Sequence, residues 1–258
     1  MIRVEHLSFA YGNGACILSD LSFEIPSGQK VVMLGTNGSG KTTLLKILNG
    51  LLFPAEGAYQ YDLHPITRSS LNDKTLHQKF RRENVLLFQN PDTMLFNPTV
   101  YDEIAFGLRQ LALPHIDEKV QYWARLLGLE KYLKHPPFQI SSGEKQKVCL
   151  AALLSLEPKV LLLDEPTSNL DPRSTGWLVD FLQDLDVTTV VTTHNLSLAG
   201  ELGDRTMVLS EDHELIFDGE ISELLEDQTK LMDANLIHTH KHRHGDVSHR
   251  HFHKHDWD

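Results

Sequence analysis

One glycine-rich stretch constrains the fold of this chain more than any other feature. Residues 35–43 read Gly-Thr-Asn-Gly-Ser-Gly-Lys-Thr-Thr and follow the apolar run at residues 30–34. They match the P-loop pattern of a glycine, four residues, Gly-Lys and then Ser or Thr. Glycines let successive backbone N–H groups turn toward one anion, and a following helix adds its N-terminal partial positive charge. The stretch therefore predicts a strand, a phosphate-binding loop and a helix at residues 42–48.

Several side chains of this loop have an expected role at a nucleotide. We expect Lys41 to reach the β- and γ-phosphates and the Thr42 hydroxyl to ligate Mg²⁺. The candidate phosphate-binding residues are Gly35, Asn37, Gly38, Ser39, Gly40, Lys41, Thr42 and Thr43. A P-loop alone indicates only that a nucleotide binds, because kinases, GTPases and motors share it.

A second motif ends in two carboxylates. The apolar run at residues 160–163 precedes Asp164 and Glu165. A buried parallel strand carries its last residues to the ligand-binding edge of a sheet. We expect Asp164 to hold Mg²⁺ through its water shell and Glu165 to orient and deprotonate an attacking water.

The rest of the chain alternates strands with helices. Strands are predicted at residues 85–88, 160–163 and 188–192, and helices at 101–111, 117–127, 142–156, 175–185 and 196–202. Such alternation predicts an α/β fold with a mostly parallel sheet flanked by helices. Residues 207–209 and 215–218 predict a closing hairpin, and the polar, basic residues 63–83 are interpreted as a surface connection.

Composition excludes some classes of protein. The formal net charge of -11 argues against a non-specific nucleic-acid binder, which needs a basic surface. Two cysteines, Cys16 and Cys149, are too few for a disulfide framework or an all-thiolate metal site. No apolar run reaches the roughly 20 residues that cross a bilayer, so a role at a membrane would require docking to other subunits.

Over residues 1–225 the sequence resembles the ATPase subunits of ABC transporters. Residues 140–144, Ile-Ser-Ser-Gly-Glu, stand where that family has its Leu-Ser-Gly-Gly-Gln signature, and residues 168–171 resemble its D-loop. The resemblance implies that His194 contacts the γ-phosphate, that Gln89 touches Mg²⁺ and senses the membrane partner, and that Tyr11 stacks on adenine. It assigns further ATP contacts to Ser141, Gly143 and Asp171.

The signature departs from the family pattern at two positions. Ser142 replaces the first glycine and Glu144 replaces the glutamine. Ser142 adds a hydroxymethyl group where the backbone approaches a phosphate, which would weaken the grip on ATP. Ser141 and the N–H of Gly143 remain available.

The resemblance also implies an architecture and partners. It implies an ABC ATPase domain over residues 1–228, with an antiparallel β subdomain and a helical subdomain at about 92–157, followed by a tail at 229–258. Two subunits, identical or different, would pack head to tail around two ATP molecules. Their closure and opening would drive transmembrane subunits from the cytoplasmic face of the membrane.

A finer resemblance concerns the cargo. Residues 88–96, 99–100 and 103–107 resemble the energy-coupling-factor (ECF) subfamily, which imports vitamins and cobalt or nickel; that subfamily usually has glutamine where Met94 stands. It implies transmembrane coupling and substrate-binding subunits as partners. The helix at 102–111 would line a groove for a coupling helix, with Ile104, Leu108 and Leu111 either in the groove or in the core.

The C-terminal tail differs in kind from the rest of the chain. From residue 238 onward histidines alternate with polar residues and no apolar period is present. Imidazole without cysteine suits Ni²⁺, Co²⁺, Zn²⁺ or Cu²⁺. A flexible chain with this spacing would wrap an ion in several ways, although a purification tag or a passive solvated tail is the alternative. The candidate ligands are His238, His240, His242, His244, His249, His251, His253 and His255.

The sequence thus favours an importer ATPase for nickel or cobalt that uses ATP and Mg²⁺. A vitamin importer or an ABC exporter with an incidental tail is one alternative. A metal-buffering or sensing protein with a vestigial nucleotide site is a second. A soluble ABC protein acting on nucleic acid or ribosomes would have tandem cassettes or coiled-coil insertions, and neither is visible in the sequence.

Overall fold

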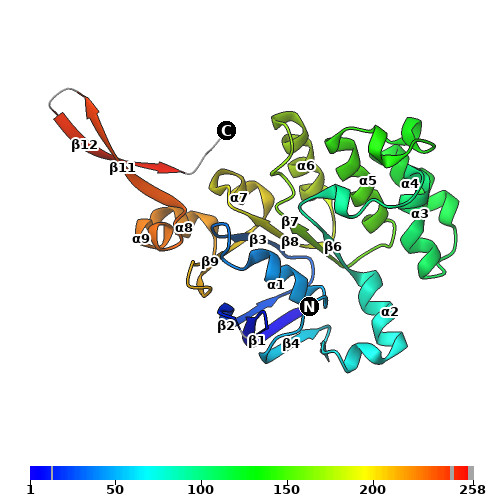
Figure 1. Ribbon diagram of the computed structural model, residues 1–258, viewed down its shortest axis with the longest axis horizontal. Coiled ribbons are helices and arrows are strands. Elements are labelled where there is room, and N and C mark those ends of the chain that lie inside the picture. Colours follow the sequence, from blue (N-terminus) through cyan, green and yellow to red (C-terminus); the bar gives the residue numbers. More distant parts are fainter. Residues whose placement is uncertain (13, 245–246, 255–258) are drawn as a thin grey trace.

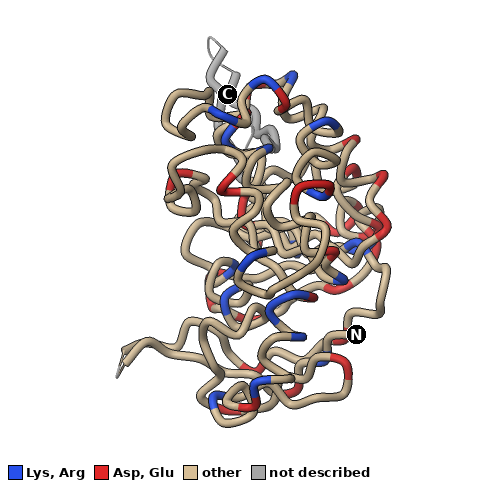
Figure 2. The backbone as a smooth tube through the Cα atoms, turned by 90° about the vertical axis from the view of Figure 1, so that its right-hand side faces the viewer, with Lys and Arg blue, Asp and Glu red and all other residues tan. Residues whose placement is uncertain are grey.

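The computed structural model of the chain describes residues 1–12, 14–244 and 247–254 (Figure 1). These residues form one sheet of six strands, one of four and one of two. Helices lie on both sides of the larger sheet, and among the helices of the described residues none is both long and apolar enough to span a bilayer. Acidic and basic residues are interspersed along the described backbone (Figure 2).

The six-stranded sheet has the strand order β10-β9-β3-β8-β7-β6. Neighbouring strands from β9 to β6 run parallel, and only β10 pairs antiparallel, with β9. Because the carboxyl ends of parallel strands meet at one edge, the segments that follow β3, β6, β7 and β8 converge there. The strands are β3 Lys30–Leu34, β6 Asn84–Leu87, β7 Val160–Asp164, β8 Thr188–Thr193, β9 Arg205–Leu209 and β10 Leu215–Gly219.

The four-stranded sheet is antiparallel. Helix α1, Lys41–Leu48, packs between this sheet and the six-stranded sheet. Its strands are β1 Ile2–Ala10, β2 Cys16–Ile25, β4 Glu56–Tyr61 and β5 His64–Pro65. Leu44, Leu45, Ile47 and Leu48 of α1 are fully buried in the apolar cluster that joins the two sheets. Burying each such side chain contributes on the order of 1.5–3 kcal/mol, so α1 and the loop before it are held firmly.

Three helices form a separate helical region beside the large sheet. Helix α3 packs against α4 and α5, and a second apolar cluster joins them to the sheet. The helices of this region are α3 Val100–Gln110, α4 Ile116–Leu126 and α5 Ser142–Leu154. The other helices are α2 Lys74–Glu83, α6 Pro172–Asp184, α7 Leu196–Leu202, α8 Ile221–Glu226 and α9 Gln228–Asp233. Short 3₁₀ turns occur at Ser70–Asn72, Pro91–Thr93, Glu130–Tyr132 and Pro137–Gln139.

Residues 63–83 lie mostly at the surface, as interpreted, but the interpretation as a mere connection missed a helix. This stretch contains helix α2, which is capped by the side chain of Asp73 and has one fully buried residue, Phe80. The Phe80 ring packs edge-on against Tyr61 with centroids 5.3 Å apart. Leu76 and Phe80 have helical spacing, but charged and polar residues dominate the stretch, so the interpretation from overall polarity overlooked this amphipathic helix.

The structure also decides between the groove and the core for helix α3. Ile104 and Leu108 are fully buried in the core, so they cannot line a surface groove, whereas Leu111 is partly buried. The exposed side of this helix instead presents Phe106, whose ring meets that of Phe96 edge-on at 4.8 Å. If this region has a docking groove, Phe96 and Phe106 line it, and Ile104 and Leu108 do not.

The C-terminal segment differs from the expected unpaired tail. Leu231, Ala234, Leu236 and Ile237 are buried in the main core, so we propose that the tail begins at residue 238 and not at 229. Strand β11, Ile237–His244, pairs antiparallel with β12, Val247–Lys254, and the hairpin extends away from the sheets in Figure 1. His255 lies outside the described residues.

Candidate active site

The loop between β3 and α1 requires glycine at several positions. Gly35, Gly38 and Gly40 have φ angles of 155°, 90° and 108°, which residues with a side chain rarely adopt. A Cβ at Gly35 would lie 2.7 Å from the carbonyl oxygen of Leu209, and one at Gly40 would lie 2.6 Å from that of Ile17. The first N–H groups of α1 have no partner within the helix, so they point with its partial positive charge toward the loop.

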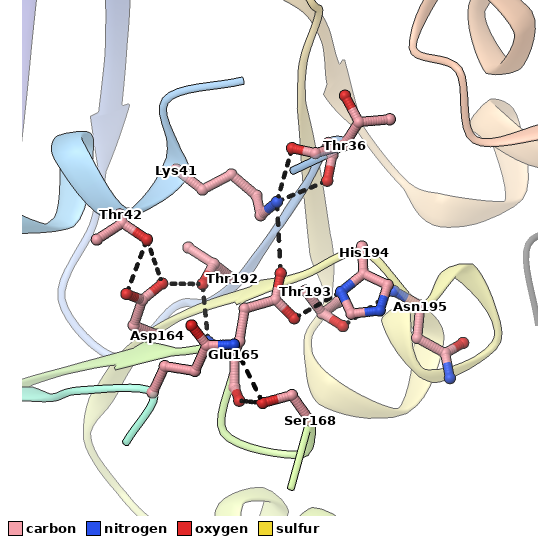
Figure 3. A network of polar contacts seen from close by, with 12 residues as sticks. Thr36, Lys41, Thr42, Asp164, Glu165, Ser168, Thr192, Thr193, His194 and Asn195 are labelled. Atoms are coloured by element: carbon pink, nitrogen blue, oxygen red, sulfur yellow. Dashed lines mark hydrogen bonds and ion pairs between the residues drawn. The ribbon is translucent and has the colours of Figure 1, made fainter. Parts of the chain in front are cut away.

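Lys41 is buried among oxygen atoms at the start of α1. Its ammonium group donates to the carbonyl oxygens of Gly35 at 2.6 Å and Thr36 at 3.0 Å. It also lies 3.4 Å from Oε1 of Glu165 (Figure 3). Burial lowers the pKa of Lys41, while the negative charges of Glu165 and Asp164 oppose that shift. The lysine is thus held at the point where the loop and the end of β7 meet.

Asp164, at the end of β7, is fixed by two threonine hydroxyls. The hydroxyl of Thr42 lies 3.0 and 2.8 Å from the two carboxylate oxygens and shares its one proton with them, and that of Thr192 donates to Oδ1 at 2.9 Å. The hydroxyl and carboxylate oxygens of these groups, with the amide oxygen of Gln89 in the same cleft, are the kind of ligand that Mg²⁺ prefers. The residues present therefore fit a magnesium ion bridging the loop and β7.

Glu165 is only 6% exposed and sits in an unusual backbone conformation, with φ 44°. Its N–H donates to the Thr192 hydroxyl at 3.0 Å, and its Oε2 lies 2.9 Å from Nδ1 of His194, a distance at which the ring N–H donates to the carboxylate. A positive φ in a residue with a side chain is strained and is maintained only where neighbours fix it. Thr192 and His194 are those neighbours (Figure 3).

Gln89 reaches this network through Ser168. The Gln89 amide donates to the Ser168 hydroxyl at 3.4 Å, and that hydroxyl donates to the backbone carbonyl of Glu165 at 2.9 Å. Sequence reasoning did not assign Ser168 this position, nor did it find Thr192. The signal for Thr192 lies in strand pairing, because β7 and β8 place Asp164 opposite Thr192.

A cleft of about 300 Å³ runs along these groups. It extends from Tyr11, whose hydroxyl lies 3.2 Å from that of Thr43, to Glu165. In the part of the chain that the structure describes, the buried Oε1 of Glu165, which lines this cleft, has no hydrogen-bond partner and only its ion pair with Lys41, and the buried Ser39 Oγ of the loop has no hydrogen-bond partner either. Such groups are costly unless a ligand or water satisfies them. The cleft is lined by Tyr11, Ile17, Asn37, Gly38, Gly40, Lys41, Thr42, Thr43, Gln89 and Glu165.

Among the predicted ATP contacts, Gly35 and Ser39 belong to the loop but do not line this cleft, and three others lie away from the loop. Ser141 caps α5, and Asp171 caps α6 by accepting from the N–H groups of Arg173 and Ser174 at 3.0 and 3.1 Å. Gly143 lies between these two caps, since a Cβ there would be 3.4 Å from the Ser174 hydroxyl. All three therefore belong to a second surface formed by the starts of α5 and α6, which we call the signature surface.

The departure from glutamine at residue 144 has a local explanation. Ser141 and Glu144 form a capping box: the Ser141 N–H donates to Oε2 of Glu144 at 2.9 Å, and the Ser141 hydroxyl accepts from the Glu144 N–H at 3.4 Å. Burial acts to raise the pKa of Glu144, but hydrogen bonds from Tyr132 and Ser141 outweigh it and the pKa is lowered. Either glutamate or glutamine can close such a box. Ser142, the other departure, is the exposed first residue of α5.

Helix α5 connects the signature surface to the cleft. The side chain of Gln146 donates to the carbonyl of Pro166 at 2.5 Å, directly after Glu165. Lys145 pairs with Asp92 at 2.7 Å, in the turn that follows Gln89. A shift of α5 would therefore move the segment after Glu165 and the turn after Gln89.

A small apolar groove lies on the far side of the same helical region. Its volume is about 160 Å³, and its mouth includes the exposed rings of Phe96 and Phe106. Cys149 lies at its base, where burial raises the pKa of the thiol to about 12, so this cysteine stays protonated and inert. The groove is lined by Met94, Leu95, Phe96, Glu103, Phe106, Gly107, Cys149, Ala152, Leu153 and Leu156.

Comparison with known proteins agrees with this geometry. The family model described as ABC transporter matches residues 18–168. A Methanosarcina acetivorans protein described as an ABC transporter ATP-binding protein is 38% identical over 97% of this chain and 98% of its own length. A similarly described protein of Caldanaerobacter subterraneus is 39% identical over 92% of this chain and 99% of its own length.

Two solved structures extend the comparison. The first is cbiO1 of Clostridium perfringens, described as part of the ABC transporter complex cbiONQ; it superposes with a TM-score of 0.77, 31% identity and coverage of 91% of this chain and 94% of that one. The second is the ATP-binding cassette MJ0796, described as a dimer in a post-hydrolysis state bound to ADP and Pi. It has a TM-score of 0.75, 26% identity and coverage of 86% and 99%.

Proposed function

This chain belongs to the ABC transporter family and is an ATP-binding cassette ATPase, and from that premise we propose that it powers import of a transition metal ion, nickel or cobalt. The observation that carries the ATPase part is that Lys41, Thr42 and Glu165 line one cleft, with Asp164 hydrogen-bonded to Thr42. The choice of cargo is supported by the ECF-like residues 88–107 and by the histidines of the tail.

The proposed chemistry assigns separate roles to the two ends of the cleft. Tyr11 stacks on the adenine, and the N–H groups of residues 38–42 together with Lys41 hold the phosphates. Magnesium held by Thr42, Asp164 and Gln89 would neutralise charge on the phosphates. Fixed donors of this kind stabilise the transition state because they need no reorganisation during the reaction.

Glu165 is the proposed general base. Its side chain is buried beside Lys41 and His194, and its Oε1 is ion-paired with Lys41 but accepts no hydrogen bond from the described residues. The carboxylate accepts the proton of that water as it attacks the terminal phosphorus. His194 and Ser168 act as positioning residues, because each fixes a different part of Glu165.

The signature surface requires a second subunit in this proposal. Within one chain Ser141, Gly143 and Asp171 lie apart from the cleft, so they would contact the ATP of a partner packed head to tail. Dimeric arrangements described for MJ0796 support this assembly. The partner is either a second copy or a related ATPase subunit.

The groove at Phe96 and Phe106 is the proposed contact with the membrane subunits, on the cytoplasmic face. An apolar groove of this kind accepts the apolar face of a helix. Lys145 and Asp92 connect the neighbourhood of Gln89 with the signature surface, so ATP closure would move the groove. The description of cbiO1 as part of the cbiONQ complex supports a multi-subunit assembly.

Transport by the assembled complex tests this proposal. The chain is expressed with its membrane subunits, and uptake of radiolabelled nickel and cobalt is compared for wild type, Glu165→Gln and a chain ending at Ile237. We expect Glu165→Gln to abolish uptake and the truncated chain to lose uptake at low metal concentration. A vitamin bound to the co-purified substrate-binding subunit, with no metal uptake above the Glu165→Gln background, would overturn the metal assignment.

A further inference from the structure

The histidines of the C-terminal hairpin stand opposite one another in register. Strands β11 and β12 pair so that His238 lies opposite His253, His240 opposite His251 and His242 opposite His249. Only Gly245 and Asp246 separate the two strands in the sequence. Because histidine alternates with other residues in both strands, this register gives three consecutive matched pairs.

The pairs also share one face of the hairpin. Residues directly opposite in an antiparallel pair belong to the same face, and every second residue along a strand returns to that face. The six paired histidines therefore occupy one face, together with His244 opposite Val247. The other face carries Thr239, Lys241, Arg243, Ser248, Arg250 and Phe252.

The spacing of these positions suits bidentate metal binding. Opposite residues have Cβ atoms about 4.5–5.5 Å apart. Two imidazole nitrogens on one ion each need about 2.0–2.1 Å, which side chains at that separation can satisfy. Successive pairs follow at about 6.8 Å, twice the rise per residue, so adjacent pairs can act separately or share an ion.

We propose that β11 and β12 form a metal-binding histidine ladder in which each cross-strand pair is the ligand unit. All-imidazole donors select Ni²⁺, Co²⁺, Zn²⁺ or Cu²⁺ over Mg²⁺. The two cysteines stand elsewhere, Cys16 in β2 and Cys149 buried under the groove. This inference rests on the proposed function only for the choice of nickel as the probe.

Metal binding by the ladder differs from metal binding by a flexible chain that merely contains many histidines. A flexible chain would bind through any two histidines, so moving them by one position would change little. In the ladder the second imidazole of each pair is presented at a high effective concentration by the hairpin. The arrangement of the histidines, and not their number, then determines affinity.

A variant of unchanged composition tests the ladder. Exchanging neighbours in β12 (Ser248→His/His249→Ser, Arg250→His/His251→Arg and Phe252→His/His253→Phe) keeps every residue type but moves three histidines to the opposite face. Calorimetric titration of the full chain with Ni²⁺ alone at pH 7.5 should give at least about tenfold weaker binding than wild type. Equal affinity would overturn the ladder, as would a wild type that binds no nickel.

Paired double variants give a second, matched comparison. His240→Ala/His251→Ala removes one pair, whereas His240→Ala/His249→Ala removes the same number of histidines but breaks two pairs. The second variant should bind fewer equivalents of nickel than the first, and identical stoichiometry would contradict the ladder. ATP hydrolysis should match wild type in all these variants, so failure of the ladder and failure of the ATPase proposal are distinguishable.

Discussion

The cleft and the signature surface carry the two halves of one proposed ATP site, yet they are stabilised in opposite ways. The cleft is built from the ends of four strands, and its side chains contact residues more than a hundred positions away, as Thr42 and Asp164 do. The signature surface is satisfied locally, since Ser141 bonds only three residues along the chain to Glu144. One half is therefore complete within this chain, and the other is preformed but lies apart from it.

Replacing Glu165 should have the largest effect, because it removes the proposed base from the complete half. We expect Glu165→Gln to lower kcat about 10²–10⁴-fold, which is the usual contribution of general base catalysis. ATP affinity should change little, since the phosphate-binding groups remain. Steady-state hydrolysis and a separate ATP-binding titration measure the two quantities, and an unaltered kcat would remove Glu165 from the mechanism.

Removing the Thr192 hydroxyl should have an intermediate effect on the same half. Thr192→Val leaves the N–H of Glu165 without its acceptor and removes one of the two hydroxyls at Oδ1 of Asp164, where that of Thr42 remains. We expect a loss of about 1–3 kcal/mol in the free energy of unfolding, as for other buried unsatisfied groups, and about tenfold slower hydrolysis. Urea denaturation and kcat measurements report these changes.

Thr189 provides a matched control in the same strand. It is equally buried, but its hydroxyl has no hydrogen-bond partner among the described residues. Thr189→Val should therefore leave stability and kcat within error of wild type or raise stability slightly. If the two variants behaved alike, the hydrogen bonds of Thr192 would not be what fixes Glu165.

The smallest effect is expected on the signature surface, for Glu144→Gln. Glutamine also closes a capping box, so hydrolysis at pH 7 should stay close to wild type. Because the pKa of Glu144 is lowered in the fold, its charge adds stability above the ordinary glutamate pKa and loses it as the pH falls through the folded pKa. Melting curves of both proteins should converge in acid, and a large loss of activity in Glu144→Gln at pH 7 would show a role beyond the cap.

The sequence predicted those parts of the cleft whose functional residues stand next to one another in a motif. The glycines at 35, 38 and 40 and the two carboxylates at the end of β7 are typical of a nucleotide site when they occur in this order, and the structure places Lys41 3.4 Å from Glu165. Thr192 and Ser168 could not be found in this way, because their roles depend on which strands are neighbours. The matching of β7 to β8 is a tertiary fact that no local pattern contains.

The same contrast explains the errors outside the site. Helix α2 is held by the buried Phe80 and by the cap from Asp73. For Ile104 the sequence left groove and core open, because helical spacing does not say what covers a given face of a helix. In the tail, the alternation of histidines has the period of a strand, but because no apolar period accompanies it, it was interpreted as a flexible chain.

Mixing two inactive variants tests the division of the site between subunits most directly. Lys41→Ala disables the cleft and Ser141→Arg disables the signature surface, so each purified chain alone should hydrolyse almost no ATP. In a head-to-tail dimer of this chain the mixture restores one intact site in each mixed pair, and about a quarter of the wild-type rate should return by random pairing. A mixture as inactive as its components, in conditions where the wild-type chain alone is active, would contradict the account.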